Sequence, residues 1–188
     1  MIDCGIPFAK MKEELYKCNT LLITHSHSDH IKPQTLMRIM SEFPRIQIYG
    51  NPDVAYQYHV NTILGTQRLR LKGKREIYVT PIDGIHDVPV KMFDIEFRDI
   101  DVEVFYGTDT SVVTNPRGSK FDYMFIESNY DEQKLKQISK QYKRKGYDPY
   151  TDSSVRHLST QKCKAFYFMN RRDEESPLIE LHMSSRFY

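Results

Sequence analysis

The sequence predicts one mixed α/β domain in which β-sheets are packed between helices. Short apolar segments typical of strands occur in both halves of the chain, and amphipathic segments typical of helices lie between them. The 188 residues suffice for one hydrophobic core but are too few for two ordinary domains, so residues 1–188 are treated as one domain. Hydrophobic residues make up 39% and charged residues 28% of the chain, which excludes extensive disorder.

The first half of the chain contains alternating strand and helix signals. Residues 21–23 are short, branched and uncharged, which predicts a buried strand. Pro33 suits the first position of a helix. A second strand is predicted over residues 45–49, and a short helix over residues 53–60. The apolar stripe of the helix that Pro33 opens is formed by Leu36, Ile39, Met40 and Phe43.

The middle of the chain is dominated by strand patterns. A turn over residues 72–75 precedes a strand over residues 76–80. Residues 92–98 and 101–106 alternate like the two strands of a hairpin, and residues 121–126 predict a further strand. Periodicity by itself indicates only that helices and strands are mixed.

The last third returns to helices before a final strand. Residues 131–145 predict a helix capped by Asp131. Ser159 or Thr160 caps another predicted helix, and residues 176–182 predict the last strand.

The strongest functional signal follows the first strand. Three histidines and one aspartate, His25, His27, Asp29 and His30, lie within six residues. Imidazole and carboxylate together suit Zn, Mn or Fe. In an extended chain His25, His27 and Asp29 share one face and His30 need not, so the segment can serve two adjacent cations. The alternative is a solvated polar turn.

This segment, Thr24-His25-Ser26-His27-Ser28-Asp29-His30, resembles the T-H-x-H-x-D-H loop of the metallo-β-lactamase superfamily. Five further segments resemble motifs of that family in the expected order: Met1-Ile2-Asp3-Cys4-Gly5, Gly84-Ile85-His86-Asp87, Tyr106-Gly107-Thr108-Asp109-Thr110, Arg156-His157-Leu158-Ser159 and Leu181-His182-Met183-Ser184. The resemblance implies a four-layer αβ/βα sandwich. Because family members usually have a strand or hairpin before the acidic strand, we expect a shortened start or an open sheet edge. An open edge favours a homodimer.

The resemblance also implies a site for two divalent metal ions, Zn or Mn. The implied ligands of the first ion are His25, His27 and His86, and those of the second are Asp29, His30 and His182, with Asp109 as the bridge. Asp29 alternatively acts mainly as a proton acceptor from the bridging water, and Asp29 and Asp109 are both expected to be catalytic. Asp3 is expected to position the ligand loop. For His86 and Asp109 the alternative is an ordinary loop or turn residue.

His157 narrows the reaction class. Its surroundings, Arg156-His157-Leu158-Ser159-Thr160, resemble the extra histidine motif of the RNase Z branch and of YycJ-type nucleases, and Glu127-Ser128-Asn129 resembles an E-S-N segment of the latter. In those proteins the histidine contacts the scissile phosphate and protonates the leaving oxygen. A histidine at a helix start beside an arginine is also a sensible anion site. The alternative is a solvated histidine before a helix cap.

We therefore expect a phosphodiesterase, and rank cyclic nucleotides or other small nucleotide phosphodiesters above nucleic acid. Compact phage anti-Pycsar proteins, which resemble this branch, hydrolyse cyclic nucleotides. The predicted substrate contacts are His157, Arg156, Ser159, Tyr147 and Tyr150, the tyrosines by stacking on a base. The tyrosines alternatively cover a sheet edge. An RNase Z-type nuclease and a non-catalytic metal-binding remnant remain alternatives.

The composition of the chain indicates in which cellular compartment the protein is expected. No run approaches the roughly 20 apolar residues that span a bilayer, and the N-terminus shows no signal-peptide pattern. The three cysteines, Cys4, Cys18 and Cys163, have no metal-like spacing and predict reduced structural thiols. We expect a cytoplasmic protein with no membrane contact.

Overall fold

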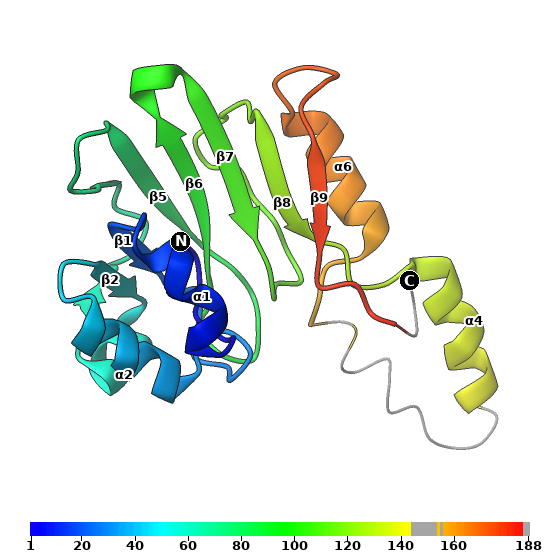
Figure 1. Cartoon of the computed structure of the whole chain (residues 1–188). Helices are drawn as coiled ribbons and strands as arrows, with labels where there is room; N and C mark the ends of the chain where they lie inside the picture. The colour runs from blue at the N-terminus through cyan, green and yellow to red at the C-terminus, as the bar shows by residue number, and fades with distance from the viewer. Residues whose placement is uncertain (144–153, 155, 186–188) are drawn as a thin grey trace.

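Two β-sheets with helices on their outer sides make up the computed structural model, which describes residues 1–143, 154 and 156–185 (Figure 1). The first sheet has the strand order β1–β2–β3, and the second has the order β4–β5–β6–β7–β8–β9. The strands are β1 (Thr20–Leu22), β2 (Gln47–Gly50), β3 (Asn61–Thr62), β4 (Leu69–Arg70), β5 (Ile77–Asp83), β6 (Lys91–Phe97), β7 (Val102–Gly107), β8 (Tyr123–Glu127) and β9 (Leu178–Leu181). The helices are α1 (Phe8–Leu15), α2 (Pro33–Glu42), α3 (Pro52–Tyr58), α4 (Glu132–Lys143) and α6 (Thr160–Asn170), with the 3₁₀ turn η1 (Arg98–Ile100).

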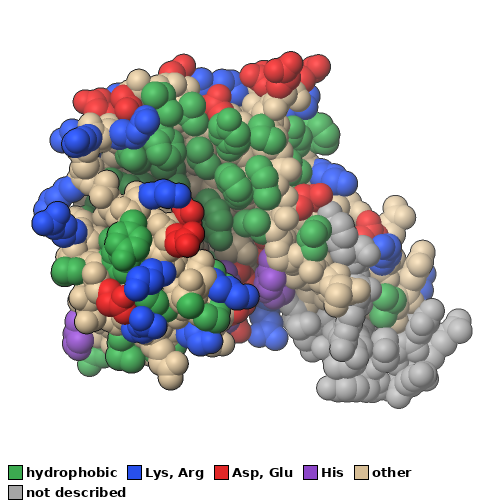
Figure 2. All heavy atoms as spheres, in the orientation of Figure 1, with side chains coloured by type: hydrophobic (Ala, Val, Ile, Leu, Met, Phe, Trp, Pro, Cys, Tyr) green, Lys and Arg blue, Asp and Glu red, His purple; other side chains and the backbone are tan. Residues whose placement is uncertain are grey.

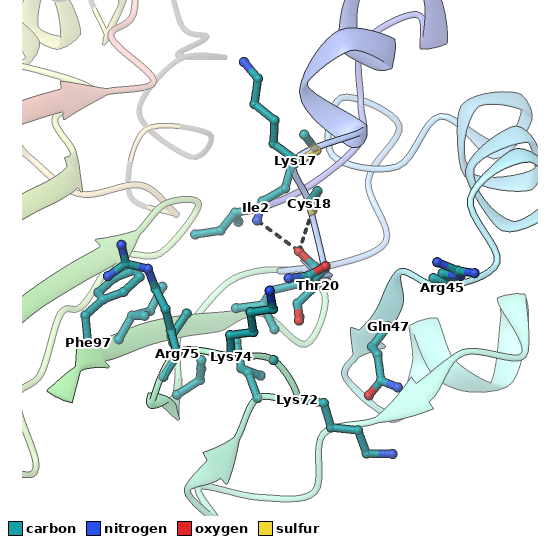
Figure 3. A pocket seen from close by; sticks show the side chains of 18 of the residues that line it. Ile2, Lys17, Cys18, Thr20, Arg45, Gln47, Lys72, Lys74, Arg75 and Phe97 are labelled. Carbon is teal, nitrogen blue, oxygen red and sulfur yellow. Dashed lines mark hydrogen bonds between the residues drawn. The ribbon is translucent and has the colours of Figure 1, made fainter. Parts of the chain in front are cut away.

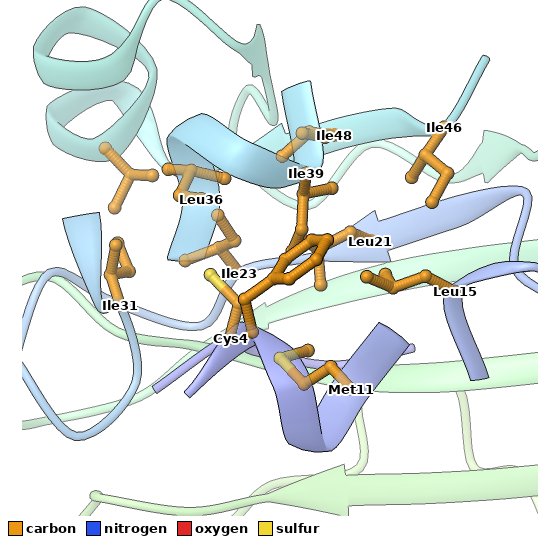
Figure 4. Close-up of a cluster of buried hydrophobic side chains, with 12 residues drawn as sticks. Cys4, Met11, Leu15, Leu21, Ile23, Ile31, Leu36, Ile39, Ile46 and Ile48 are labelled. Carbon is orange, nitrogen blue, oxygen red and sulfur yellow. The ribbon is translucent and has the colours of Figure 1, made fainter. Parts of the chain in front are cut away.

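Three clusters of buried side chains lie between successive layers. One joins α1 and α2 to the first sheet, and Figure 4 shows Met11, Leu21 and Ile39 meeting there. A small cluster that includes Leu22 and Phe93 lies between the two sheets. A third packs α6 against the second sheet through residues such as Phe166. The layers therefore run helix, sheet, sheet, helix.

Most elements in the first half form where the sequence predicts them. The strand over residues 21–23 is confirmed with a shift of one residue, and α2 begins at Pro33. The expected apolar stripe of α2 was wrong at Met40, which is 39% exposed because the buried face is formed by Thr35, Leu36 and Ile39. Helix α1 was not predicted, although Phe8, Met11 and Leu15 recur at helical spacing and are buried.

The second sheet places several strand ends at one edge. Strands β6 and β7 form the predicted antiparallel hairpin, and β5 pairs antiparallel with β6. Strands β7, β8 and β9 are mutually parallel. The C-terminal ends of β5, β7, β8 and β9 therefore share an edge, and the residues that follow these strands come together there.

The capping residues predicted for the last two helices are the ones that the structure shows. Asp131 accepts hydrogen bonds from the backbone amides of Gln133 and Lys134 at the start of α4. The Ser159 side chain accepts from the amide of Lys162 and caps α6. Among the described helices, none is long and apolar enough to cross a membrane.

Candidate metal centre

The ligand loop leaves β1 and is held in place by Asp3. The Asp3 Oδ1 atom accepts a hydrogen bond from the Thr24 amide at 2.8 Å, and Oδ2 lies 2.7 Å from Nδ1 of His30. Gly5 lets the two segments approach, because a Cβ there would lie 1.6 Å from the Asp29 carbonyl oxygen. The predicted positioning role of Asp3 therefore matches its contacts.

His25, His27 and His86 form the first group of possible metal ligands. The ring centroid of His25 lies 4.7 Å from that of His27 and 5.5 Å from that of His86. Burial, together with the nearby charge of His30, lowers the pKa of His25 to about 3, so its ring is neutral at pH 7. Its Nε2 atom is buried and has no hydrogen-bond partner among the described residues. A buried ring nitrogen without a partner fits a metal ligand.

Asp109 connects the remaining groups. It clusters with His25 and His30 on one side, and with Glu127, His157 and His182 on the other. Asp109 Oδ2 lies 3.0 Å from Nε2 of His30, and its Oδ1 lies 3.1 Å from Nδ1 of His182. Burial favours the protonated form of Asp109, but hydrogen bonds from His182 and His30 prevail and hold its pKa well below the usual range. The carboxylate lies centrally, as expected of a bridging ligand.

The histidines around Asp109 are polarised by carboxylates. Hydrogen bonds to Asp109 and Glu127 raise the pKa of His182 to about 10. Burial lowers the pKa of His30, but its hydrogen bonds to Asp109 and Asp3 outweigh burial and raise the pKa to about 10. A metal bound at these rings must displace their protons.

Three residues of this centre have left-handed backbones: Asp3, Asp109 and His182, with φ values of 57°, 52° and 54°. Such conformations are uncommon outside glycine and persist only where the surroundings enforce them. Asp109 follows β7 and His182 follows β9, so in each case the sharp change of direction comes directly after a strand.

Glu127 is a site residue that the sequence reasoning did not assign. It ends β8, is fully buried, and its Oε1 atom lies 2.7 Å from Nδ1 of His157 and 2.9 Å from Nδ1 of His182. Its Oε2 atom accepts a hydrogen bond from the Thr110 amide at 2.9 Å. A glutamate at the end of an apolar strand was the available signal, since such a group is seldom buried without partners.

Asp87 is a second residue that was not assigned. Its Oδ1 atom lies 3.0 Å from Nε2 of His86 and 3.4 Å from Nε2 of His27, and its Oδ2 atom accepts from Arg156 at 3.1 Å. Asp29 has a 65% exposed side chain 3.7 Å from Nε2 of His30. Neither Asp87 nor Asp29 belongs to the ligand groups found among the described residues. The Asp87 carboxylate thus lies against two histidines, and that of Asp29 lies against one.

Of the residues predicted to contact the substrate, some lie at the candidate metal centre and others do not. The His157 ring lies 5.2 Å from that of His86 and 4.9 Å from that of His182, and the Arg156 side chain is 48% exposed beside it. Ser159 is fully buried and its hydroxyl donates to Glu132, so its side chain serves the helix cap. Tyr147 and Tyr150 lie outside the described residues.

Space for a ligand adjoins the centre. A cavity of about 340 Å³ is lined by Asp3, Asp29, His30 and Tyr106, among others. In Figure 2 histidine side chains appear low in the hollow between the half with the first sheet and the half with the second. The arrangement can hold cations beside a solvent-accessible cleft, and histidine with carboxylate and no thiolate suits Zn, Mn or Fe.

No family model matches the sequence, and no curated protein matches it. Solved structures do. A metallo-β-lactamase fold protein, YhfI from Bacillus subtilis, is 18% identical with a TM-score of 0.68, covering 97% of this chain and 73% of that one. The short form of human tRNase Z is 18% identical with a TM-score of 0.64, covering 98% and 81%. A diphosphatase from the PhnP family is 16% identical with a TM-score of 0.60, covering 99% and 69%. The chain has the metallo-β-lactamase fold.

Proposed function

We propose that this chain is a metal-dependent phosphodiesterase that acts on cyclic nucleotides or other small nucleotide phosphodiesters. The proposal depends mainly on the position of His157. Its Nδ1 atom is hydrogen-bonded to the buried Glu127 carboxylate, and its ring centroid lies 5.2 Å from that of His86 and 4.9 Å from that of His182. A histidine beside metal-ligand candidates and an exposed Arg156 suits a reaction at a phosphate.

The proposed ligand set follows the resemblance except at Asp29. His25, His27 and His86, which lie together, would hold one cation. His30 and His182, which lie 3.0 Å and 3.1 Å from the two carboxylate oxygens of Asp109, would hold the other, with Asp109 between the cations. Asp29 is exposed next to His30, which suits the proton-accepting role better than a ligand role. Two bound divalent cations would supply an activated water and stabilise the attacking and leaving oxygens of the phosphodiester.

The residues around the cations have separate tasks. Because Glu127 engages Nδ1 of His157, the Nε2 atom is the one left to donate a proton to the leaving oxygen. Arg156 pairs with the exposed carboxylate of Asp87 and can exchange this partner for a substrate phosphate. Glu127 holds both histidines, so it acts through them rather than on the substrate.

A nuclease is the second candidate. It is favoured by the likeness to human tRNase Z over 98% of this chain, and by the exposed basic loop 72–75. A metal-binding remnant without activity is the third candidate, and the clustering of the ligand candidates argues against it because packing alone does not require so many buried ionisable groups.

One screen tests these alternatives. The protein loaded with manganese or zinc is assayed on bis-(p-nitrophenyl) phosphate, cyclic mononucleotides and single-stranded RNA, with Asp109→Asn as the inactive control. We expect turnover of the first two substrates. Preference for RNA would favour the nuclease, and bound metal with no turnover on any of the three would favour the remnant.

A further inference from the structure

A cavity of about 1090 Å³ opens between the two sheets on the side where β1, β2 and β5 begin (Figure 3). It is lined by Thr20, Gln47 and Ile77, which begin β1, β2 and β5. The candidate metal ligands instead follow the ends of β1, β5 and β7. None of the candidate metal ligands lines this cavity, although Met1, Ile2 and Glu14 also line the smaller cavity beside His30.

The rim of this cavity is strongly basic. Its lining includes five cationic side chains and one carboxylate, that of Glu14; the cations are Lys17, Arg45, Lys72, Lys74 and Arg75. Lys17 pairs with Glu14, and Arg75 pairs with Asp99. Within the described part of the chain, Arg45, Lys72 and Lys74 have no carboxylate partner. A chain with a net charge of only +2 thus concentrates unpaired positive charge at this opening.

The floor of the cavity is apolar and only partly covered. It is formed by side chains from both sheets and their connections: Ile2, Leu22, Leu71, Ile77, Val79, Ile95 and Phe97. Ile2, Ile95 and Phe97 are half-buried, so part of their apolar surface faces the opening. In Figure 2 hydrophobic side chains gather over the second sheet above α1, with Lys and Arg at the margin. Exposed apolar surface of this kind favours a ligand that covers it.

We propose that this cavity binds a small organic anion with an apolar body, the body lying on the Ile95–Phe97 floor and the anionic group against the basic rim to which Lys72, Lys74 and Arg45 belong. Its volume of about 1090 Å³ is just above the usual range of small-molecule sites, roughly 300–1,000 Å³, so such a molecule fits inside it. A purely apolar occupant would leave the cations without a counter-charge, and inorganic phosphate alone would leave the floor uncovered. Only a molecule with both properties satisfies both surfaces.

The first test uses 8-anilinonaphthalene-1-sulfonate, a fluorescent aromatic anion, on the full chain. The variant Lys72→Glu/Lys74→Glu reverses two exposed rim charges, and Lys162→Glu/Lys164→Glu makes the same charge change on exposed positions of α6. We expect the rim variant to bind the probe about tenfold more weakly, which corresponds to about 1.4 kcal/mol, and the α6 variant to bind like wild type. Equal binding in wild type and both variants would overturn the proposal.

Cys18 provides a second readout that needs no substitution of the floor. It lines the cavity and is partly exposed, whereas Cys4 and Cys163 are buried. Bound probe should therefore slow the alkylation of Cys18 by neutral iodoacetamide, and the rim variant should lose this protection. Cys18 that reacts equally fast with and without probe would contradict the assignment, as would a stable dimer that protects Cys18 with no anion present.

Competition identifies the source of the anion. Displacement of the probe by ATP would assign a nucleotide, and displacement by decanoate a fatty acid; displacement by neither would overturn the proposal. Because no candidate metal ligand lines the cavity, the metal content of the rim variant and its turnover of the small substrate bis-(p-nitrophenyl) phosphate should stay at wild-type levels. If the protein proved to have no phosphodiesterase activity at all, the probe-binding test of this cavity would still be valid.

Discussion

Glu127 and His157 are joined by a 2.7 Å hydrogen bond between Oε1 and Nδ1, across thirty positions of the sequence and inside the protein. The same Oε1 atom also holds His182. Glu127→Gln keeps the shape but removes the charge that orients both rings, so we expect metal affinity and kcat to fall about 10–100-fold, the usual effect of a lost outer partner. Metal titration and assays on bis-(p-nitrophenyl) phosphate measure this. Wild-type values for both would mean that Glu127 serves the fold alone.

Removing a central ligand should abolish turnover without unfolding the chain. His25→Ala deletes a buried ring whose Nε2 has no partner among the described residues, and Asp109→Asn keeps the left-handed backbone that Asn tolerates. We expect both variants to lose bound metal and activity while their circular dichroism is unchanged. His59→Asn, an exposed residue with φ of 55°, is the matched control. Full activity in either ligand variant would refute the assignment.

His157 and His182 should differ in what their loss removes. His157→Ala is expected to keep near-normal metal content but lose about 10²–10⁴ in rate, the range for a general acid or base. His182→Ala is expected to lose metal. Both rings contact Oε1 of Glu127, so metal analysis combined with kinetics is the measurement that distinguishes the two roles. Metal loss on substitution of His157 instead would show that the two roles are exchanged.

Arg156 should contribute to substrate binding more than to the chemical step. Its side chain is 48% exposed, and its one ion pair among the described residues is with the exposed Asp87. We expect Arg156→Ala to raise KM for a cyclic nucleotide severalfold, and Arg156→Lys to restore part of it because charge returns without the bidentate geometry. Lys120→Ala serves as the control, because the Lys120 ammonium group donates to the Met169 carbonyl oxygen and, within the described part of the chain, contacts none of the site residues. A fall in kcat with unchanged KM would argue against phosphate binding.

The raised pKa of Asp94 leads us to expect that the stability of the protein depends on pH. Burial, followed by the nearby charge of Glu103, raises its pKa from 3.8 to about 6, although Arg117 opposes the shift. The folded state therefore binds more protons than the unfolded state between these values, and stability falls as pH rises through this window. Relative to Asp94→Asn, wild type should lose up to about 1.4 kcal/mol per pH unit from pH 4 to 6 in urea unfolding. A difference that is constant with pH would contradict this origin.

Site residues that are close together in the sequence were predicted better than site residues that only the fold brings together. The ligand loop could be identified because His25, His27 and His30 are close in sequence and of one chemical kind. Glu127 and Asp87 stand in motifs quoted from the sequence but were given no role, because their role depends on which strand ends share an edge, and periodicity does not determine strand order. The same limit applies to Asp29, whose exposure follows from the turn after His27 rather than from alternation along an extended chain.

The fold elements show a similar division. Helix α2 and the β6–β7 hairpin were predicted because Pro33 and the alternating residues are local signals. Helix α1 was missed because it lacks a side-chain cap at Pro7 and no acidic residue occupies its first turn. Its three buried residues form a helix because the first sheet offers an apolar surface, which is a tertiary effect.

The scattering of the site along the sequence has a consequence for synthesis. His25 leaves the ribosome long before His182, and the Asp109 carboxylate between them is held by both His30 and His182. A nascent chain that has completed the first sheet would thus expose an incomplete set of imidazoles until β9 emerges and joins β8. The contacts of Asp109 are thus completed only when the last strand has joined the sheet.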